Sequence, residues 1–106
     1  MTSTRQTNDE LASLIDEITV DCHDEDEQLT AFENAFYDAH LPCPGTLIGE
    51  SIEVLSVGIA TGRRELIATC RHNEHRYDIA LLDITLDADP ATSRLLAAYR
   101  RWTSTF

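Results

Sequence analysis

Lysine is absent from this sequence of 106 residues, and all eight of its basic residues are arginine. Nineteen aspartates and glutamates bring the formal net charge to −11 at pH 7. A field of this sign repels nucleic acid and attracts cations or basic protein surfaces. The composition therefore disfavours direct binding of nucleic acid. An acidic, lysine-free composition can also arise from solvation in a salty cytoplasm or from a GC-rich genome, with no partner implied.

Cysteine is scarce, and long apolar segments are missing. The cysteines Cys22, Cys43 and Cys70 are odd in number, widely spaced and without a CxxC pair. This disfavours a disulfide scaffold and favours a reducing compartment. No apolar run approaches the ~18 residues of a membrane helix, and the polar first eight residues lack an apolar signal region. We expect a cytoplasmic protein without a membrane partner.

The motifs of the common catalytic sites are also missing. With four glycines, the chain has no glycine-rich phosphate loop, and it contains neither HExxH nor a nucleophile elbow. Cysteine and histidine both occur, but no motif orients them as a nucleophile and its base. We expect a protein that is not an enzyme.

The length suits a single domain spanning residues 1–106. We expect residues 1–6 to be disordered, because the capping box of Thr7 and Glu10 then marks a helix start. Apolar residues with helical spacing follow this box: Leu11, Leu14, Ile15 and Ile18. Asp24 and Glu27 predict the cap of a second helix, which ends near His40 before two prolines. Its apolar face would consist of Leu29, Phe32, Ala35, Phe36 and Ala39.

Residues 51–57, 65–70 and 75–82 are rich in apolar and β-branched residues and predict a three-strand antiparallel meander. Turns are expected at residues 60–64 and 72–75. Asp89 and Pro90 then start a third helix, since Asp caps and Pro suits the first helical position. The apolar face of this helix comprises Leu95, Leu96, Tyr99 and Trp102.

These elements predict an α+β fold with two N-terminal helices, a small antiparallel sheet and a C-terminal helix. The sheet would be a small barrel or a curled sheet. The corresponding segments are a helical part at 8–45, a small β-barrel at 46–88 and a C-terminal helix at 89–104.

The densest acidic segment, which we call the acid run, has five carboxylates within seven residues. It consists of Asp21, Asp24, Glu25, Asp26 and Glu27. Calcium takes about six to eight oxygen ligands, largely from carboxylates and carbonyls, so the acid run is a candidate metal site. An EF-hand is excluded, because a loop starting at Asp21 would have Asp26 where glycine is needed and Phe32 where the bidentate glutamate is needed. The alternative is an acidic helix N-terminus in solvent, which the helix dipole favours.

Two further groupings compete with the acid run. Cys70, His72 and His75, joined by Cys22 and His23, have the ligand types of a zinc site, although Cys70 is equally suited to be a small strand hydrophobe. Four arginines at or near the predicted turns could form a local basic edge: Arg63, Arg64, Arg71 and Arg76.

Several segments carry a resemblance to a known family. Residues 17–28 (EITVDCHDEDEQ), 31–32, 41–43 (LPC), 48–55 (IGESIEVL), 88–94 (ADPATSR) and 99–102 (YRRW) occur in this order. Together they resemble the small bacterial calcium-binding proteins named after a cyanobacterial member, over most of the chain from residue 17 to 102. The chain departs from that pattern at residues 58–64, where its turn is short and carries two arginines. The resemblance implies a helical N-terminal part, an SH3-like small barrel, and calcium binding by acidic surface residues, which here are those of the acid run.

The sequence thus favours a non-catalytic acidic protein that binds calcium or another divalent cation as a sensor or buffer. The alternative is an acidic interaction module that docks on a basic protein surface. Such a module could inhibit a nucleic-acid-binding protein by presenting phosphate-like charge.

Overall fold

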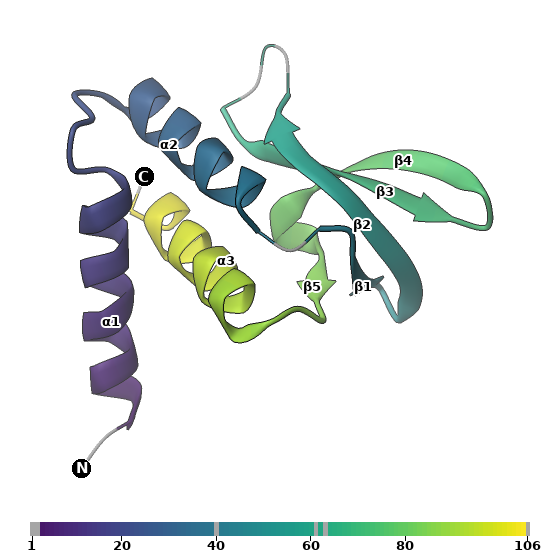
Figure 1. Ribbon diagram of the computed structural model, residues 1–106, viewed down its shortest axis with the longest axis horizontal. Coiled ribbons are helices and arrows are strands. Elements are labelled where there is room, and N and C mark those ends of the chain that lie inside the picture. The colour runs from purple at the N-terminus through teal and green to yellow at the C-terminus, as the bar shows by residue number, and fades with distance from the viewer. Residues whose placement is uncertain (1–2, 40, 61, 63, 106) are drawn as a thin grey trace.

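The structure is a computed structural model, and it describes residues 3–39, 41–60, 62 and 64–105. Within them, three α-helices lie to one side of a five-stranded antiparallel sheet (Figure 1). The helices are α1 (Ser3–Ile18), α2 (Glu25–Tyr37) and α3 (Pro90–Thr103). The strands are β1 (Cys43–Leu47), β2 (Glu50–Ile59), β3 (Leu66–His72), β4 (His75–Ala80) and β5 (Thr85–Leu86), with a 3₁₀ helix η1 (Leu81–Asp83) before β5. The predicted α+β fold is confirmed.

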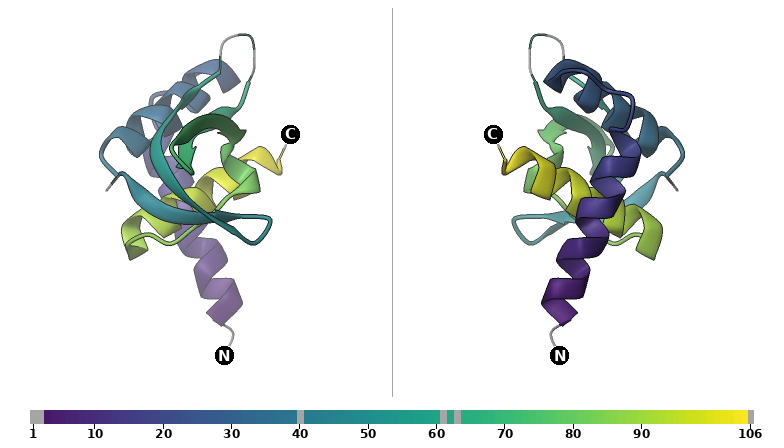
Figure 2. Two further views of the ribbon diagram at one scale, coloured as in Figure 1. Left: turned by 90° about the vertical axis from the view of Figure 1, so that its right-hand side faces the viewer. Right: turned by 90° about the vertical axis from the view of Figure 1, so that its left-hand side faces the viewer.

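The strand order in the sheet is β4-β3-β2-β1-β5, and every neighbouring pair is antiparallel. Strands β2, β3 and β4 form the predicted meander. A register shift between Val54 and Ser56 marks a bulge in β2, and bulges increase the local bend and twist of a strand. The sheet curls, as Figure 2 shows, but β4 and β5 remain as separate edges. Of the two expected forms, the structure has the curled sheet and not the closed barrel.

Strand β1 starts at Cys43, so the sheet begins three residues before the expected boundary at residue 46. The sequence does not predict β1, because Pro44 and Gly45 are residues that ordinarily interrupt a strand. Gly45 is required there for close packing: a Cβ at this position would lie 3.0 Å from the Thr85 carbonyl oxygen and 3.1 Å from a methyl carbon of Ile84. The absent side chain therefore lets β5 approach β1.

Two hairpins close with two-residue turns. Asn73 and Glu74 have φ of 51° and 69°, which is the type I′ geometry, so the predicted turn at residues 72–75 is confirmed. Ile48 and Gly49 join β1 to β2 with φ of 48° and 80°. Of the loop predicted at residues 60–64, residues 61 and 63 lie outside the described part of the chain.

Helix α1 begins at Ser3, within the segment that we expected to be disordered. It continues through Thr7, so Thr7 is not its N-cap as the capping box predicted. Residues 3–6 contain neither glycine nor proline, and their helix propensities cost little, so nothing in the segment stops the helix. Helix α1 packs mainly on α3 and also on α2.

An aromatic cluster holds α2 and α3 together over the sheet. The ring centroids of Phe32 and Trp102 are 5.2 Å apart, and those of Phe32 and Tyr99 are 5.6 Å apart. The Tyr99 hydroxyl accepts a hydrogen bond from the Leu66 backbone N–H at 2.9 Å, which ties α3 to β3. The predicted apolar face of α3 is buried, as are Leu29, Phe32 and Phe36 of α2. Helix α2 ends at Tyr37, while His40, its expected end, is outside the described residues.

Among the described helices, none combines the length and the apolarity that a membrane span needs.

Candidate functional site

The acid run lies where the chain passes from α1 into α2. Asp21 is in the connection, Asp24 is the N-cap of α2, and Glu25, Asp26 and Glu27 form its first turn. All five residues are exposed. The partial positive charge of a helix N-terminus favours carboxylates in this position, which explains how so many acids are tolerated together.

Asp24 and Glu27 form one pair within the acid run. The Asp24 Oδ1 atom accepts a hydrogen bond from the Glu27 backbone N–H at 2.9 Å, as the predicted cap requires. In return, the Glu27 Oε2 atom accepts from the His23 backbone N–H at 2.8 Å. These bonds fix both carboxylates in orientation, and each retains a second oxygen for another ligand.

Glu25 and Asp26 form a second pair around a basic side chain from the sheet. Arg64, between β2 and β3, lies with its Nη1 atom 3.5 Å from Glu25 Oε2 and its Nε atom 3.4 Å from Asp26 Oδ1. The three side chains are 50% to 72% exposed, so solvent screens both ion pairs and each is worth about 0–1 kcal/mol. The acid run therefore already holds one cationic group.

The thiol of Cys22 lies beside the acid run, and its pKa is affected by the neighbouring carboxylates. Its Sγ atom donates to the Glu27 carbonyl oxygen at 3.4 Å. Desolvation, followed by the charges of Glu27, Asp21 and Asp24, raises the pKa of the Cys22 thiol. A raised pKa favours the protonated thiol, which is the form that can donate this hydrogen bond.

No point in the described part of the chain is surrounded by three or more histidine, cysteine, aspartate or glutamate side chains that could hold a metal ion. Four of the five carboxylates of the acid run are turned in two directions, Asp24 and Glu27 toward backbone donors and Glu25 and Asp26 toward Arg64. A multidentate cation site here would require Glu25 and Asp26 to leave Arg64. The five ligands assigned from the sequence stay a prediction.

The zinc grouping does not converge either. Cys70 is fully buried on the inner face of β3, where its thiol donates weakly to the Ala68 carbonyl oxygen at 3.8 Å. Burial is the first cause that raises the pKa of Cys70, which disfavours the thiolate that zinc needs. His72 instead contacts the Ser51 carbonyl oxygen. Cys70 is thus the small strand hydrophobe of the alternative interpretation.

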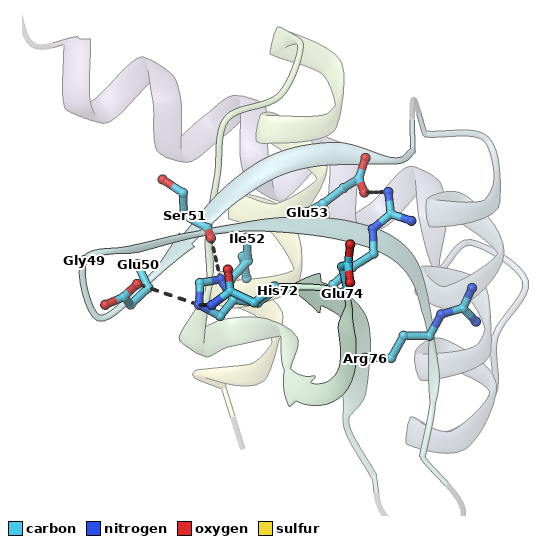
Figure 3. A pocket seen from close by; sticks show the side chains of 10 residues that line it. Gly49, Glu50, Ser51, Ile52, Glu53, His72, Glu74 and Arg76 are labelled. Carbon is cyan, nitrogen blue, oxygen red and sulfur yellow. Dashed lines mark hydrogen bonds and ion pairs between the residues drawn. The ribbon is translucent and has the colours of Figure 1, made fainter.

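An open hollow of about 980 Å³ lies over the β1–β2 and β3–β4 hairpins (Figure 3). His72 Nδ1 is 3.0 Å from the Ser51 carbonyl oxygen, and His72 Nε2 is 3.8 Å from Glu50 Oε2. Arg71 pairs with Glu53 across the strands. The charges of the lining are mixed, with Glu50, Glu53 and Glu74 beside Arg71 and Arg76.

The predicted basic edge is therefore not a continuous surface. Arg71 is neutralised by Glu53, and Arg64 lies against α2. Arg63 is outside the described residues. No pattern in the sequence predicts the hollow, because its lining comes from two hairpins whose pairing depends on strand register.

Two solved structures have the fold of this chain. The crystal structure of CcbP from Anabaena superposes with a TM-score of 0.73 at 18% sequence identity, over 98% of this chain and 94% of that one. A calcium-binding protein in its calcium-binding form superposes with a TM-score of 0.77 at 20% identity, over 99% and 97% of the two chains. No family model matches the sequence, and no curated protein is significantly similar to it. The resemblance seen in the sequence is thus confirmed at the level of the fold.

Proposed function

We propose that this chain is a non-catalytic protein that binds calcium, or another divalent cation, through the acid run. The observation that carries the proposal is the match in fold, over nearly the whole of both chains, to a protein that binds calcium. The acid run adds five exposed carboxylates, and oxygen ligands of this type are those that calcium prefers.

The geometry suggests how a cation would enter. Asp24 and Glu27 are already oriented by backbone hydrogen bonds, while Glu25 and Asp26 must exchange Arg64 for the metal. Two exposed ion pairs are weak, so their loss opposes binding only slightly. A sensor would use this exchange, because release of Arg64 removes its contact with the start of α2. A buffer would bind calcium without that change.

A calorimetric calcium titration at moderate salt tests the site. We expect saturable binding by the native protein and none by the Asp24→Asn, Asp26→Asn double variant. The fold should survive, because asparagine also caps helices and the Asp26 ion pair is exposed.

The matched control is Asp16→Asn with Glu17→Gln on α1, which removes the same charge from exposed positions outside the acid run. This control should bind calcium like the native protein. Calcium affinity that is the same in the native protein and the acid-run variant would reject these ligands.

A second candidate function is an acidic interaction module that docks on a basic protein surface. The contact of Arg64 with Glu25 and Asp26 supports it, since an arginine from a partner could make the same pairs. The partner could be a nucleic-acid-binding protein, inhibited by phosphate-like charge. This function predicts that a calorimetric titration of the native protein with calcium shows no heat of binding. It also predicts that the native protein captures a basic protein and that the double variant does not.

We propose the cytoplasm as the compartment. The support is that Cys22, Cys43 and Cys70 are free thiols, which suits a reducing environment.

A further inference from the structure

Strand β4 is an edge of the sheet, and its free side is turned away from the helices (Figure 1). His75 to Asp78 are all exposed, and Tyr77 keeps 49% of its surface accessible. Strand β4 has no proline, lysine or bulge to protect its edge, and its two full charges, Arg76 and Asp78, are of opposite sign. Such an edge is a template for a further strand.

The turn between β3 and β4 determines which backbone groups face outward. In a type I′ turn the His75 N–H bonds back to the His72 carbonyl, so His75 directs its backbone groups at β3. Along an antiparallel strand, every second residue forms backbone hydrogen bonds with the same neighbour, so Tyr77 and Ile79 also bond to β3. The N–H and C=O groups of Arg76, Asp78 and Ala80 therefore point away from the sheet.

A second copy of β4 could pair antiparallel with this edge in registers centred on Arg76, Tyr77 or Asp78. Centring on Arg76 or on Asp78 places like charges directly opposite each other, which is destabilising. Centring on Tyr77 places Arg76 opposite Asp78 of the second copy, and Asp78 opposite its Arg76. All three registers place outward backbone groups opposite each other, so side-chain charge is what selects the register centred on Tyr77.

We infer that β4 is a self-association surface, at which two copies of this chain pair their β4 strands about a two-fold axis at Tyr77. Each Arg76–Asp78 pair joins opposite charges over two backbone hydrogen bonds. The two Tyr77 residues form the central pair without hydrogen bonds, where side chains approach most closely. The interface is isologous and closes as a dimer.

The distribution of charge agrees with this surface. The whole chain carries −11, which opposes self-association, but thirteen of its nineteen acids lie in residues 1–54. The β3–β4 hairpin is balanced, with Arg71 and Arg76 against Glu74 and Asp78. An interface of one six-residue strand is small, so the dimer is weak and its population depends on protein and salt concentration.

Sedimentation velocity over a protein concentration series tests the pairing, in buffers of low and moderate salt. The native chain should show a reversible monomer–dimer equilibrium. Salt should raise the dimerisation constant, because it screens the repulsion between two chains that each carry −11. Arg76→Asp places Asp opposite Asp78 of the second copy, and Asp78→Arg places Arg opposite its Arg76. Each variant should therefore lower the dimerisation constant by about tenfold or more.

An equimolar mixture of the two variants should dimerise again, since every opposed pair is then of opposite charge. This recovery distinguishes strand pairing from a folding defect. Arg101→Asp, which makes the same charge change on an exposed position of α3, should dimerise like the native chain.

A native chain that stays monomeric at all concentrations would overturn the inference. The β4 edge would then be available for pairing with an extended segment of a different protein. Dimers that persist in both single variants, or a mixture that remains monomeric, would also overturn it.

Discussion

At the scale of residues, Arg64 links the sheet to helix α2. It comes from the connection between β2 and β3 and contacts Glu25 and Asp26 at the start of α2. Because a guanidinium and a metal ion compete for the same oxygens, this residue should lower the calcium affinity of the acid run.

Arg64→Gln should therefore raise calcium affinity, by up to about fivefold if the exposed ion pairs are together worth about 1 kcal/mol. Calorimetric titration measures the change. Arg101→Gln removes the same charge from α3 and controls for the general increase in negative potential. An equal rise in both variants would show that Arg64 does not compete at the site.

The sequence predicted local features of these residues but not their long-range contacts. Asp24 and Asp89 are N-caps as expected, because a cap depends on residues three positions away. The loop with Arg64 was also expected. Its contact with α2 could not be, because it depends on how far β2 extends and how α2 packs on that strand.

At the scale of elements, α3 is fixed by its aromatic face. Trp102 is 7% exposed, its ring lies 5.2 Å from that of Phe32, and its Nε1–H donates to Gln28 Oε1 at 2.7 Å. The side chain thus fills the junction of α3 with α2 and also satisfies its own polar group.

Trp102→Ala should lower the free energy of unfolding by roughly 3–5 kcal/mol, because it removes a large buried side chain and leaves a cavity. A urea titration gives the value. Tyr37→Ala is the control: Tyr37 is an aromatic residue of α2 that is 69% exposed, so its loss should cost less than about 0.5 kcal/mol. A loss below ~1 kcal/mol for Trp102→Ala would contradict the docking role of α3.

The strands show why some elements can be predicted from sequence and others cannot. Strands β2, β3 and β4 are long enough for alternation and composition to identify them. Strand β5 has two residues, too few for any period, and it exists because Gly45 allows close approach of the chain. The breaker residues of β1 are compatible with a strand only in this tertiary setting.

At the scale of the whole molecule, acidic and balanced regions are separated. The acid run lies at the start of α2, while the balanced β3–β4 hairpin projects from the sheet (Figure 1). The proposed cation site and the proposed self-association surface therefore lie on different parts of the molecule. They are coupled mainly through net charge, because a bound cation lowers the repulsion between two copies.

Calcium should also stabilise the fold as a whole, since a ligand that binds only the folded state shifts the unfolding equilibrium. At a hundredfold excess over the dissociation constant the gain is about 2.7 kcal/mol. For a domain of this size that corresponds to a rise in melting temperature of about 10–20 °C. Thermal unfolding followed by circular dichroism gives the measurement.

The large net charge makes the control essential. Any salt screens the repulsion among nineteen acids and so stabilises the folded chain to some extent. Sodium chloride at matched ionic strength measures that general effect, and magnesium, which gives up its water ligands reluctantly, measures the effect of divalent charge. Calcium should exceed both in the native protein, and the Asp24→Asn, Asp26→Asn variant should lose the excess while keeping the screening effect. Equal shifts with all three salts would mean that calcium acts on this protein only as a screening ion.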